Sequence, residues 1–230
     1  MTYKPEDIII VGDSFCVHRE KETDWPVYLT KLLTGTKELP RGKGFGGQSW
    51  WSVRKELLLE LKKAPCKVLV LCHTEAHRIW SDLNRPINFA SVERDFNLQS
   101  TTGPDYVDSK DLNQAAALYY KYLYSVDFHN WSNQAWFNEL VEIVVNNNIE
   151  KVIHLHCFRF GDDQINIFKK GVTITNVLNE YVAAEDKVPR EGLNPRISNH
   201  FTHELNVKFA SELYKVITSN IADTTATLSL

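Results

Sequence analysis

The stretch Asp7-Ile8-Ile9-Ile10-Val11-Gly12-Asp13-Ser14-Phe15 decides the fold. Its continuous apolar run is typical of a strand that is buried on both faces of a parallel sheet. Gly12, Asp13 and Ser14 then form a turn where this strand ends. Because open α/β sheets usually bind ligands at the carboxyl ends of their strands, this turn is a candidate functional site.

The rest of the chain alternates strands with helices. Further apolar, β-branched runs predict strands at residues 67–72, 151–156 and 171–175. Helical spacing of apolar side chains predicts helices at 25–33, 50–61, 136–145 and 209–217, with room for one more strand between the first two. Right-handed crossovers would place helices on both faces of the sheet. The sequence therefore predicts an α/β fold, a three-layer α/β/α sandwich around a mostly parallel five-stranded sheet.

The domain boundaries follow from the breaks in this pattern. We expect residues 1–220 to form a single domain and residues 221–230 a flexible C-terminal tail. Residues 81–109 lack periodicity, which predicts an insertion or lid at about 81–130. The aromatic segment at 119–131 could line a substrate groove, pack in the core or form an oligomer contact. The oligomeric state stays open.

Composition narrows the classes of partner. The chain has 230 residues, is 43% hydrophobic and carries a net charge of −3 with scattered basic residues, which argues against binding to nucleic acid or an anionic membrane. No apolar run approaches the roughly 20 residues of a membrane span, and the N-terminus does not resemble a signal peptide. The four cysteines lack the spacing of a zinc site, so we expect reduced, buried thiols. These features predict a cytoplasmic protein with no cofactor.

Four sequence blocks occur in the order of one known family. They are VGDSF, DWPVYLTKLL, GFGGQSWW and NHFTHELNVKFASEL. The chain resembles the SGNH, or GDSL, hydrolases, most densely over residues 1–75 and near the C-terminus. The resemblance implies a flavodoxin-like fold and serine-dependent ester hydrolysis. The departures described below are similar to those of divergent members encoded by tailed phages, which implies a location in the host cytoplasm.

The resemblance also implies roles for particular residues. Ser14 corresponds to the nucleophile, whose backbone N–H contributes to the oxyanion hole, and His200 corresponds to the catalytic base. Gly47 corresponds to the oxyanion glycine, with Gly46 as the next choice. Asp13 belongs to the same turn as Ser14 and is included among the candidate substrate-binding residues.

In the third family block, this sequence has Thr74 where the family has an asparagine that donates to the oxyanion. A threonine hydroxyl can donate one hydrogen bond but reaches less far than an amide. His73 or Arg78 could donate in its place.

The last block also departs from the family pattern. Ile197 stands where an aspartate should orient the histidine, so the resemblance implies a Ser14–His200 dyad, with Asn199 or a backbone carbonyl fixing the imidazole. Within this block, Thr202 is expected to cap the last helix. His203 is interpreted as a helix-start or surface residue.

The expected function is hydrolysis of a small acyl ester, such as an O-acetyl group on a small molecule or glycan, through an acyl-enzyme. The main alternative is a catalytically impaired scaffold that binds a carbohydrate or a protein partner. Asp13 or Ser14 could also serve only as a helix cap.

Two rival chemistries use other residues. The histidines of His73-Thr74-Glu75-Ala76-His77 and His154-Leu155-His156 could bind a metal ion, although their spacing is not that of a zinc protease. The segment GFGGQS lacks the Lys-Ser or Lys-Thr ending of a phosphate-binding loop, which argues against nucleotide binding.

Overall fold

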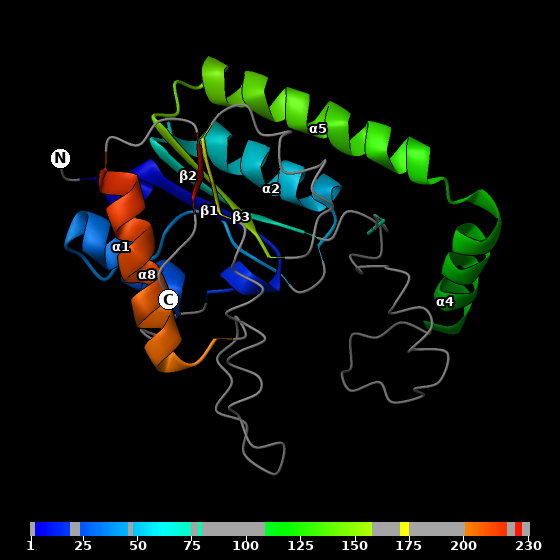
Figure 1. Cartoon of the computed structure of the whole chain (residues 1–230), viewed down its shortest axis with the longest axis horizontal. Helices are drawn as coiled ribbons and strands as arrows, with labels where there is room; N and C mark the ends of the chain where they lie inside the picture. Colours follow the sequence, from blue (N-terminus) through cyan, green and yellow to red (C-terminus); the bar gives the residue numbers. More distant parts are fainter. Residues whose placement is uncertain are drawn as a thin grey trace, which may run out of the picture.

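A parallel sheet forms the centre of the molecule (Figure 1). The computed structural model describes residues 3–18, 24–45, 48–74, 78–79, 109–157, 171–174, 201–219 and 224–226. The sheet order is β1-β2-β3-β4-β5, and every neighbouring pair is parallel. The strands are β1 (Ile8–Gly12), β2 (Val68–His73), β3 (Lys151–His156), β4 (Val172–Ile174) and β5 (Thr224–Ala226). The predicted α/β class with a parallel sheet is therefore confirmed.

Four of the described helices agree with the predicted ones at their core-facing parts, and the helix at residues 109–118 was not predicted. They are α1 (Trp25–Thr34), α2 (Trp50–Lys63), α4 (Ser109–Leu118), α5 (Val126–Asn146) and α8 (His203–Thr218). Shorter turns are η1 (Pro5–Asp7), η2 (Ser14–Cys16) and the π-helical turn η3 (Tyr119–Leu123). The start of α5 lies well before the predicted residue 136, and the start of α8 lies before the predicted residue 209.

Alternate residues of the strands face two separate hydrophobic cores. Ile8 and Ile10 of β1 lie in a core with α1 and α8, whereas Ile9 and Val11 lie in a core with α2 and α5. All four side chains are fully buried. Because strand side chains alternate between faces, the continuous apolar run of β1 satisfies both cores at once. Figure 1 shows the same arrangement, with α1 and α8 on one face of the sheet and α2 and α5 on the other.

The segment around Arg41 pairs with the free edge of β1. Arg41 N donates to Ile8 O at 3.0 Å, and Ile10 N donates to Arg41 O at 2.9 Å. Parallel bridges join Ile9 to Arg41 and Gly12 to Gly44. The additional strand that was expected between the first two helices therefore takes the form of two isolated bridges.

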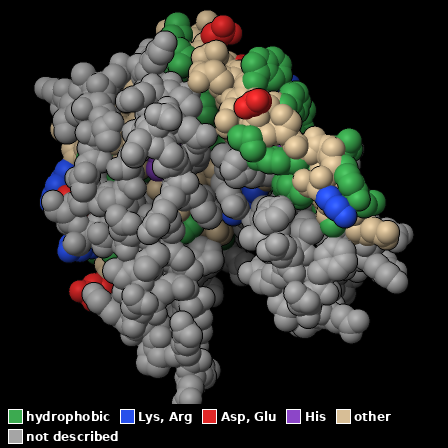
Figure 2. Space-filling model, turned by 45° about the vertical axis from the view of Figure 1, so that its right-hand side comes forward, with side chains coloured by type: hydrophobic (Ala, Val, Ile, Leu, Met, Phe, Trp, Pro, Cys, Tyr) green, Lys and Arg blue, Asp and Glu red, His purple; other side chains and the backbone are tan. Residues whose placement is uncertain are grey.

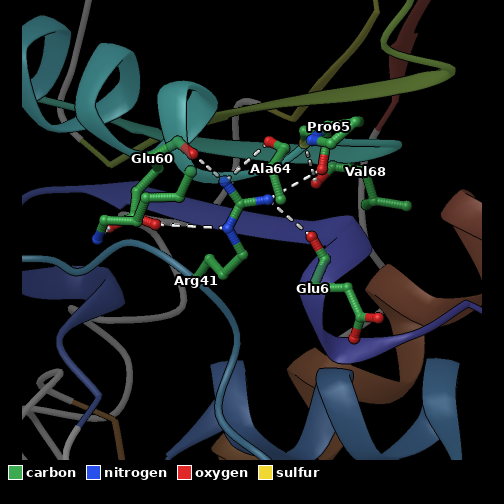
Figure 3. Close-up of polar contacts among 8 residues, drawn as sticks. Glu6, Arg41, Glu60, Ala64, Pro65 and Val68 are labelled. Carbon is green, nitrogen blue, oxygen red and sulfur yellow. Dashed lines mark hydrogen bonds and ion pairs between the residues drawn. The ribbon is translucent and has the colours of Figure 1, made fainter.

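The Arg41 side chain fixes this edge to the end of α2 (Figure 3). Its guanidinium donates to the backbone oxygens of Glu6 at 2.8 Å, Pro65 at 2.9 Å and Ala64 at 3.0 Å. It also donates to Glu60 O and lies 3.4 Å from the Glu60 carboxylate. The planar, multi-donor guanidinium suits this role, since it satisfies several carbonyls that follow helix α2.

Helix α4, the turn η3 and the first residues of α5 form the described part of the insertion expected at about 81–130. The C-terminal half of α5 packs on the sheet through Phe137, Leu140 and Val144, whereas its N-terminal half extends past the sheet toward α4 (Figure 1). Residues 80–108 lie outside the described part. Among the described helices, none has both the length and the apolar composition needed to cross a bilayer.

The C-terminal segment differs from the expected tail. Residues 224–226 form strand β5, which pairs in parallel with β4 after helix α8. The short Thr-Thr-Ala sequence has no apolar run, which explains why its pairing was not predicted.

Candidate functional site

The turn after β1 is tightly enclosed. Gly12 has a φ of +151°, and a Cβ atom at this position would lie 2.2 Å from Cys72 O on the neighbouring strand. A Cβ on Gly44 would lie 2.4 Å from Asp13 O. Only glycine allows the two flanking segments to approach this closely, so both positions fix the path of the chain into Ser14.

Ser14 is the first residue of η2, directly after the carboxyl end of β1. The preceding Asp13 caps this turn, since its carboxylate accepts from Phe15 N at 3.0 Å. Ser14 is half-buried, and its hydroxyl forms no hydrogen bond within the described parts of the chain. Asp13 and Ser14 were both considered as caps, and Asp13 is the one that caps the turn. The Ser14 hydroxyl is therefore not used for capping.

A buried ion pair lies behind the turn. The Asp13 carboxylate is fully buried, and Arg78 Nη1 lies 3.5 Å from its Oδ2 atom. The same Arg78 nitrogen donates to Thr74 Oγ1 at 2.9 Å. A carboxylate without solvent requires such a positive partner, because the cost of desolvating an isolated charge is several kcal/mol. Asp13 and Arg78 thus support one another beneath the candidate nucleophile.

Thr74, the candidate third oxyanion donor, is fully buried after β2. Its hydroxyl donates to Gln48 O, in the segment that leads into α2. Since a hydroxyl has only one proton to donate, Thr74 as placed here holds two loops together. Arg78 accompanies it at the same sheet edge.

The start of α8 is bound to the Ser14 turn. Phe201 is buried and its ring lies 6.0 Å from that of Phe15, in an edge-to-face contact. Phe15 O also accepts from Trp25 Nε1 at 2.7 Å. The residues next to Ser14 and His200 in sequence are therefore in contact.

Asn206 joins this region to α1. It is fully buried, accepts from Trp25 N at 2.7 Å and donates to Thr202 O at 2.9 Å and Phe201 O at 3.3 Å. Thr202 caps α8 as expected, by accepting from Leu205 N at 3.3 Å. His203 begins α8 and is exposed, as interpreted from the sequence.

Several predicted site residues lie outside the described parts of the chain. They are His200, Gly46, Gly47, Ile197, Asn199, Glu75 and His77. Of the remaining candidates, Ser14, Asp13, Thr74 and Arg78 lie together at the carboxyl ends of β1 and β2.

His73 belongs to a different environment. It is stacked between β3 residues His154 and His156, with ring centroids 5.1 and 4.9 Å away and ring planes within 20°. His73 Nε2 and His154 Nδ1 are 2.9 Å apart in a hydrogen bond. Trp50 and Phe137 contact the other sides of the ring. His73 is thus part of the core beneath α2 and α5.

Burial favours the neutral forms of His73 and His156. It lowers the pKa of His73 well below its usual value, and the neighbouring His156 and His154 lower it further. Burial, followed by the charge of His154, lowers the pKa of His156 to about 3.

The arrangement of the histidine rings argues against the hypothesis that they bind a metal ion. Parallel, stacked imidazole rings do not direct their nitrogens toward one point, which a metal ion would require. Over the described ranges, no group of three or more His, Cys, Asp or Glu side chains is arranged to hold a metal ion.

The four cysteines are free and buried, as expected from their spacing. Burial raises the pKa of Cys66 to about 12 and that of Cys157 to about 11. These thiols are therefore protonated near neutral pH and are poor nucleophiles.

The sequence placed Trp25 and Asn206 within the family-like blocks, with Asn206 at the terminal position of the last block, but it did not predict their hydrogen bonds. Trp25 and Asn206 connect α1, the Ser14 turn and α8, but each looks like an ordinary residue of an amphipathic helix. The sequence does show that Asn206 is a polar residue on the apolar face of α8, and a polar side chain at such a position is expected to form hydrogen bonds.

Comparison with known proteins gives no relative for this arrangement: no protein-family model, no curated protein and no solved structure matches the chain.

Proposed function

We propose that the protein is a serine ester hydrolase of the SGNH type, with Ser14 as nucleophile and His200 as base. The observation that carries this proposal is the environment of Ser14. It is a half-buried serine at the carboxyl end of β1, its hydroxyl is not used by the described structure, and its turn is held by Asp13 and Arg78. A nucleophile needs this combination of a fixed backbone and an uncommitted hydroxyl.

The strand order supports the finer fold assignment. With the segment at 41–44 placed beside β1, the sheet reads 41–44, β1, β2, β3, β4. This is the doubly wound order 2-1-3-4-5 of flavodoxin-like folds. Strand β5 would then be an addition after α8.

The contacts of α8 support the choice of His200 as base. Phe201 packs on Phe15, so the backbone at residue 201 is held close to the turn that carries Ser14. Thr202 and Asn206 fix the direction in which the chain enters α8. A base must be within hydrogen-bond reach of the nucleophile, and these contacts favour that arrangement.

The proposed reaction has two steps. His200 accepts the Ser14 proton while Ser14 Oγ bonds to the ester carbonyl carbon, and the Ser14 and Gly47 N–H groups stabilise the oxyanion. The C–O bond to the alcohol breaks and His200 protonates the departing oxygen. Water then attacks the acyl-enzyme, with His200 again taking and returning a proton, which releases the acid and free Ser14.

Arg78 contributes a fixed positive charge near this turn. Its side chain is only 8% exposed and is bonded to Asp13 and Thr74, so it is a positioning residue for the loop rather than a mobile cation. The substrate is a small-molecule or glycan ester with a short acyl group, and the location is cytoplasmic.

The second candidate function is a binding module that has lost turnover. Thr74 favours it, because its hydroxyl donates to Gln48 O and so is not directed to an oxyanion. Loss of one oxyanion donor reduces rates by about 10²- to 10³-fold in well-studied hydrolases.

A hydrolysis assay separates the two functions. We expect p-nitrophenyl acetate to be hydrolysed faster than the palmitate ester, and Ser14→Ala and His200→Ala each to reduce the rate to that of buffer. Since the Ser14 hydroxyl has no partner in the described structure, Ser14→Ala should unfold at the same urea concentration as the parent protein. Equal rates for the parent and Ser14→Ala proteins would favour the binding module.

A further inference from the structure

An aromatic pocket lies between the start of α2 and the N-terminal half of α5. Its volume is about 300 Å³, at the lower end of the range for small-molecule sites. Five rings line it: Trp50, Trp51, Tyr119, Phe128 and Trp136. They come from α2, η3 and α5, and of the lining residues Tyr119, Phe128 and His129 belong to the insertion expected at about 81–130.

The surface next to this pocket is also rich in apolar side chains. Figure 2 shows hydrophobic side chains gathered along the ridge at the upper right, over α5. Its exposed members include Val126, Phe128 and Trp131. Phe128 belongs to both the ridge and the pocket, whereas Trp131 does not line the pocket.

Neutral polar groups alternate with the rings. Ser49, Ser132 and Asn133 lie in the same wall. The Ser132 hydroxyl donates to Phe128 O at 2.9 Å, so its oxygen can still accept a hydrogen bond. The Ser49 hydroxyl is already engaged as the cap of α2. The pocket therefore offers flat apolar faces, the Ser132 hydroxyl oxygen as an acceptor, and the buried indole N–H groups of Trp50 and Trp136 as donors.

The charges of the pocket are already compensated. Arg54 forms a two-point ion pair with the Glu139 carboxylate at 2.6 and 2.5 Å. Arg78 is paired with Asp13. His129 Nε2 is hydrogen-bonded to the Tyr119 hydroxyl at 2.9 Å. An anionic ligand would have to compete with these partners, so the pocket favours a neutral one.

We propose that this pocket binds a neutral sugar ring. A pyranose has a C–H face that packs on aromatic rings and equatorial hydroxyls that pair with neutral polar groups, which matches both parts of the lining. A purely apolar ligand would leave the buried indole N–H groups of Trp50 and Trp136 without an acceptor.

The pocket adjoins the Ser14 turn through Arg78, which lines the pocket and contacts Asp13. The sugar is therefore the alcohol part of the ester substrate. This last assignment rests on the proposed function; binding of the sugar does not.

The test uses the full-length Ser14→Ala protein, which cannot turn over an ester. It is titrated with the methyl glycosides of glucose, galactose, mannose and N-acetylglucosamine, and with cyclohexanol as an apolar ring of similar size. Tryptophan fluorescence and the indole N–H resonances report binding. We expect saturable, millimolar binding of at least one glycoside, with shifts of the Trp50 and Trp136 resonances, and weaker binding of cyclohexanol.

Two tryptophan variants provide the matched comparison. Trp51 is 49% exposed and lines the pocket, so Trp51→Ala should weaken binding about tenfold without unfolding the protein. Trp131 is 66% exposed and lies outside the pocket, so Trp131→Ala should bind as the parent does. Ser132→Ala tests the polar part of the wall independently and should also weaken binding.

The proposal is overturned if none of the four glycosides binds saturably, if cyclohexanol binds as well as they do, or if Trp131→Ala weakens binding as much as Trp51→Ala. Sugar binding without ester hydrolysis by the parent protein would contradict the proposed function alone. Hydrolysis by a protein that binds no glycoside would contradict only the sugar pocket.

Discussion

Ser14 and Asp13 are adjacent in sequence but have opposite environments. The Ser14 hydroxyl is not used by the described structure, whereas the Asp13 carboxylate is fully buried, caps η2 and pairs with Arg78. We therefore propose a chemical role for Ser14 and a supporting role for Asp13. Substitutions that affect Asp13 should therefore change the stability of the fold, whereas substitutions of Ser14 should change activity alone.

Removal of the Arg78 charge should destabilise the protein strongly. Arg78→Met leaves the buried Asp13 carboxylate without this cation, which should lower the free energy of unfolding by about 3 kcal/mol. Arg54→Met is the matched control, because its ion pair with Glu139 is partly exposed and should contribute less than about 1 kcal/mol. Urea unfolding measures both, and equal losses would contradict the structural role of Arg78.

Replacement of Asn206 by a side chain of similar size should also destabilise the protein strongly. Asn206→Leu keeps the volume but removes the side-chain acceptor of Trp25 N and the side-chain donor to Phe201 O, whereas Thr202 O still accepts from the backbone N–H of residue 206. We expect a loss of about 2 to 4 kcal/mol in the free energy of unfolding. Asn138→Leu, at an exposed position of α5, should have little effect. If both variants unfold at the parent's urea midpoint, Asn206 does not hold α8 to α1.

At this scale, the sequence predicted the turn at Ser14 but not the hydrogen bonds and ion pair that Asp13, Thr74 and Arg78 form beside it. Gly12, Asp13 and Ser14 are contiguous, so a turn after a strand could be recognised directly. The pairing of Asp13 with Arg78, 65 positions later, depends on how β1 and β2 align, which residue spacing alone does not reveal. The same reason explains why His73 was considered for the oxyanion site: its strand end was predicted, but the face on which its ring lies was not.

At the scale of elements, continuous apolar runs predicted the positions of the strands well. The predicted strands at 7–11, 67–72, 151–156 and 171–175 coincide with β1 to β4 because each run is buried on both faces. Helix α5 was predicted too short because its first turns bury little: Val126, Phe128 and Trp131 are exposed, so no apolar stripe marks them.

The edge of the sheet beside β1 depends on Arg41. Arg41→Met removes the donors that serve Glu6 O, Ala64 O and Pro65 O, and leaves the nearly buried Glu60 without this partner. We expect a loss of about 3 kcal/mol in the free energy of unfolding.

Arg41→Lys separates charge from geometry. A lysine keeps the positive charge but cannot donate to several carbonyls in one plane, so it should recover less than half of the lost stability. Full recovery in urea unfolding would show that charge alone is required.

At the scale of the whole molecule, the stacked histidines couple stability to pH. His73 and His156 have folded pKa values below the usual value for histidine, so the unfolded chain binds more protons. Their stabilising contribution is complete above about pH 6.5 and is lost as the pH falls toward the folded pKa of His156, about 3. The free energy of unfolding should decrease over this window.

A variant can isolate the contribution of one ring. A histidine that is protonated in the unfolded chain but neutral in the folded protein makes the free energy of unfolding fall by about 1.4 kcal/mol for each unit that the pH decreases. His156→Gln should therefore reduce this slope between pH 6 and pH 4 by about that amount. Urea unfolding at several pH values measures this slope, and identical slopes in the parent and His156→Gln proteins would contradict the burial of a neutral His156.

The most direct test of the central claim is the site of covalent labelling by a fluorophosphonate, a reagent that reacts with activated serines. We expect one adduct, mapped by peptide mass spectrometry to Ser14, that is absent in a folded His200→Ala protein because the base no longer accepts the Ser14 proton. A correctly folded parent protein with no adduct on Ser14, or equal labelling of Ser14 in His200→Ala, would contradict the proposed dyad.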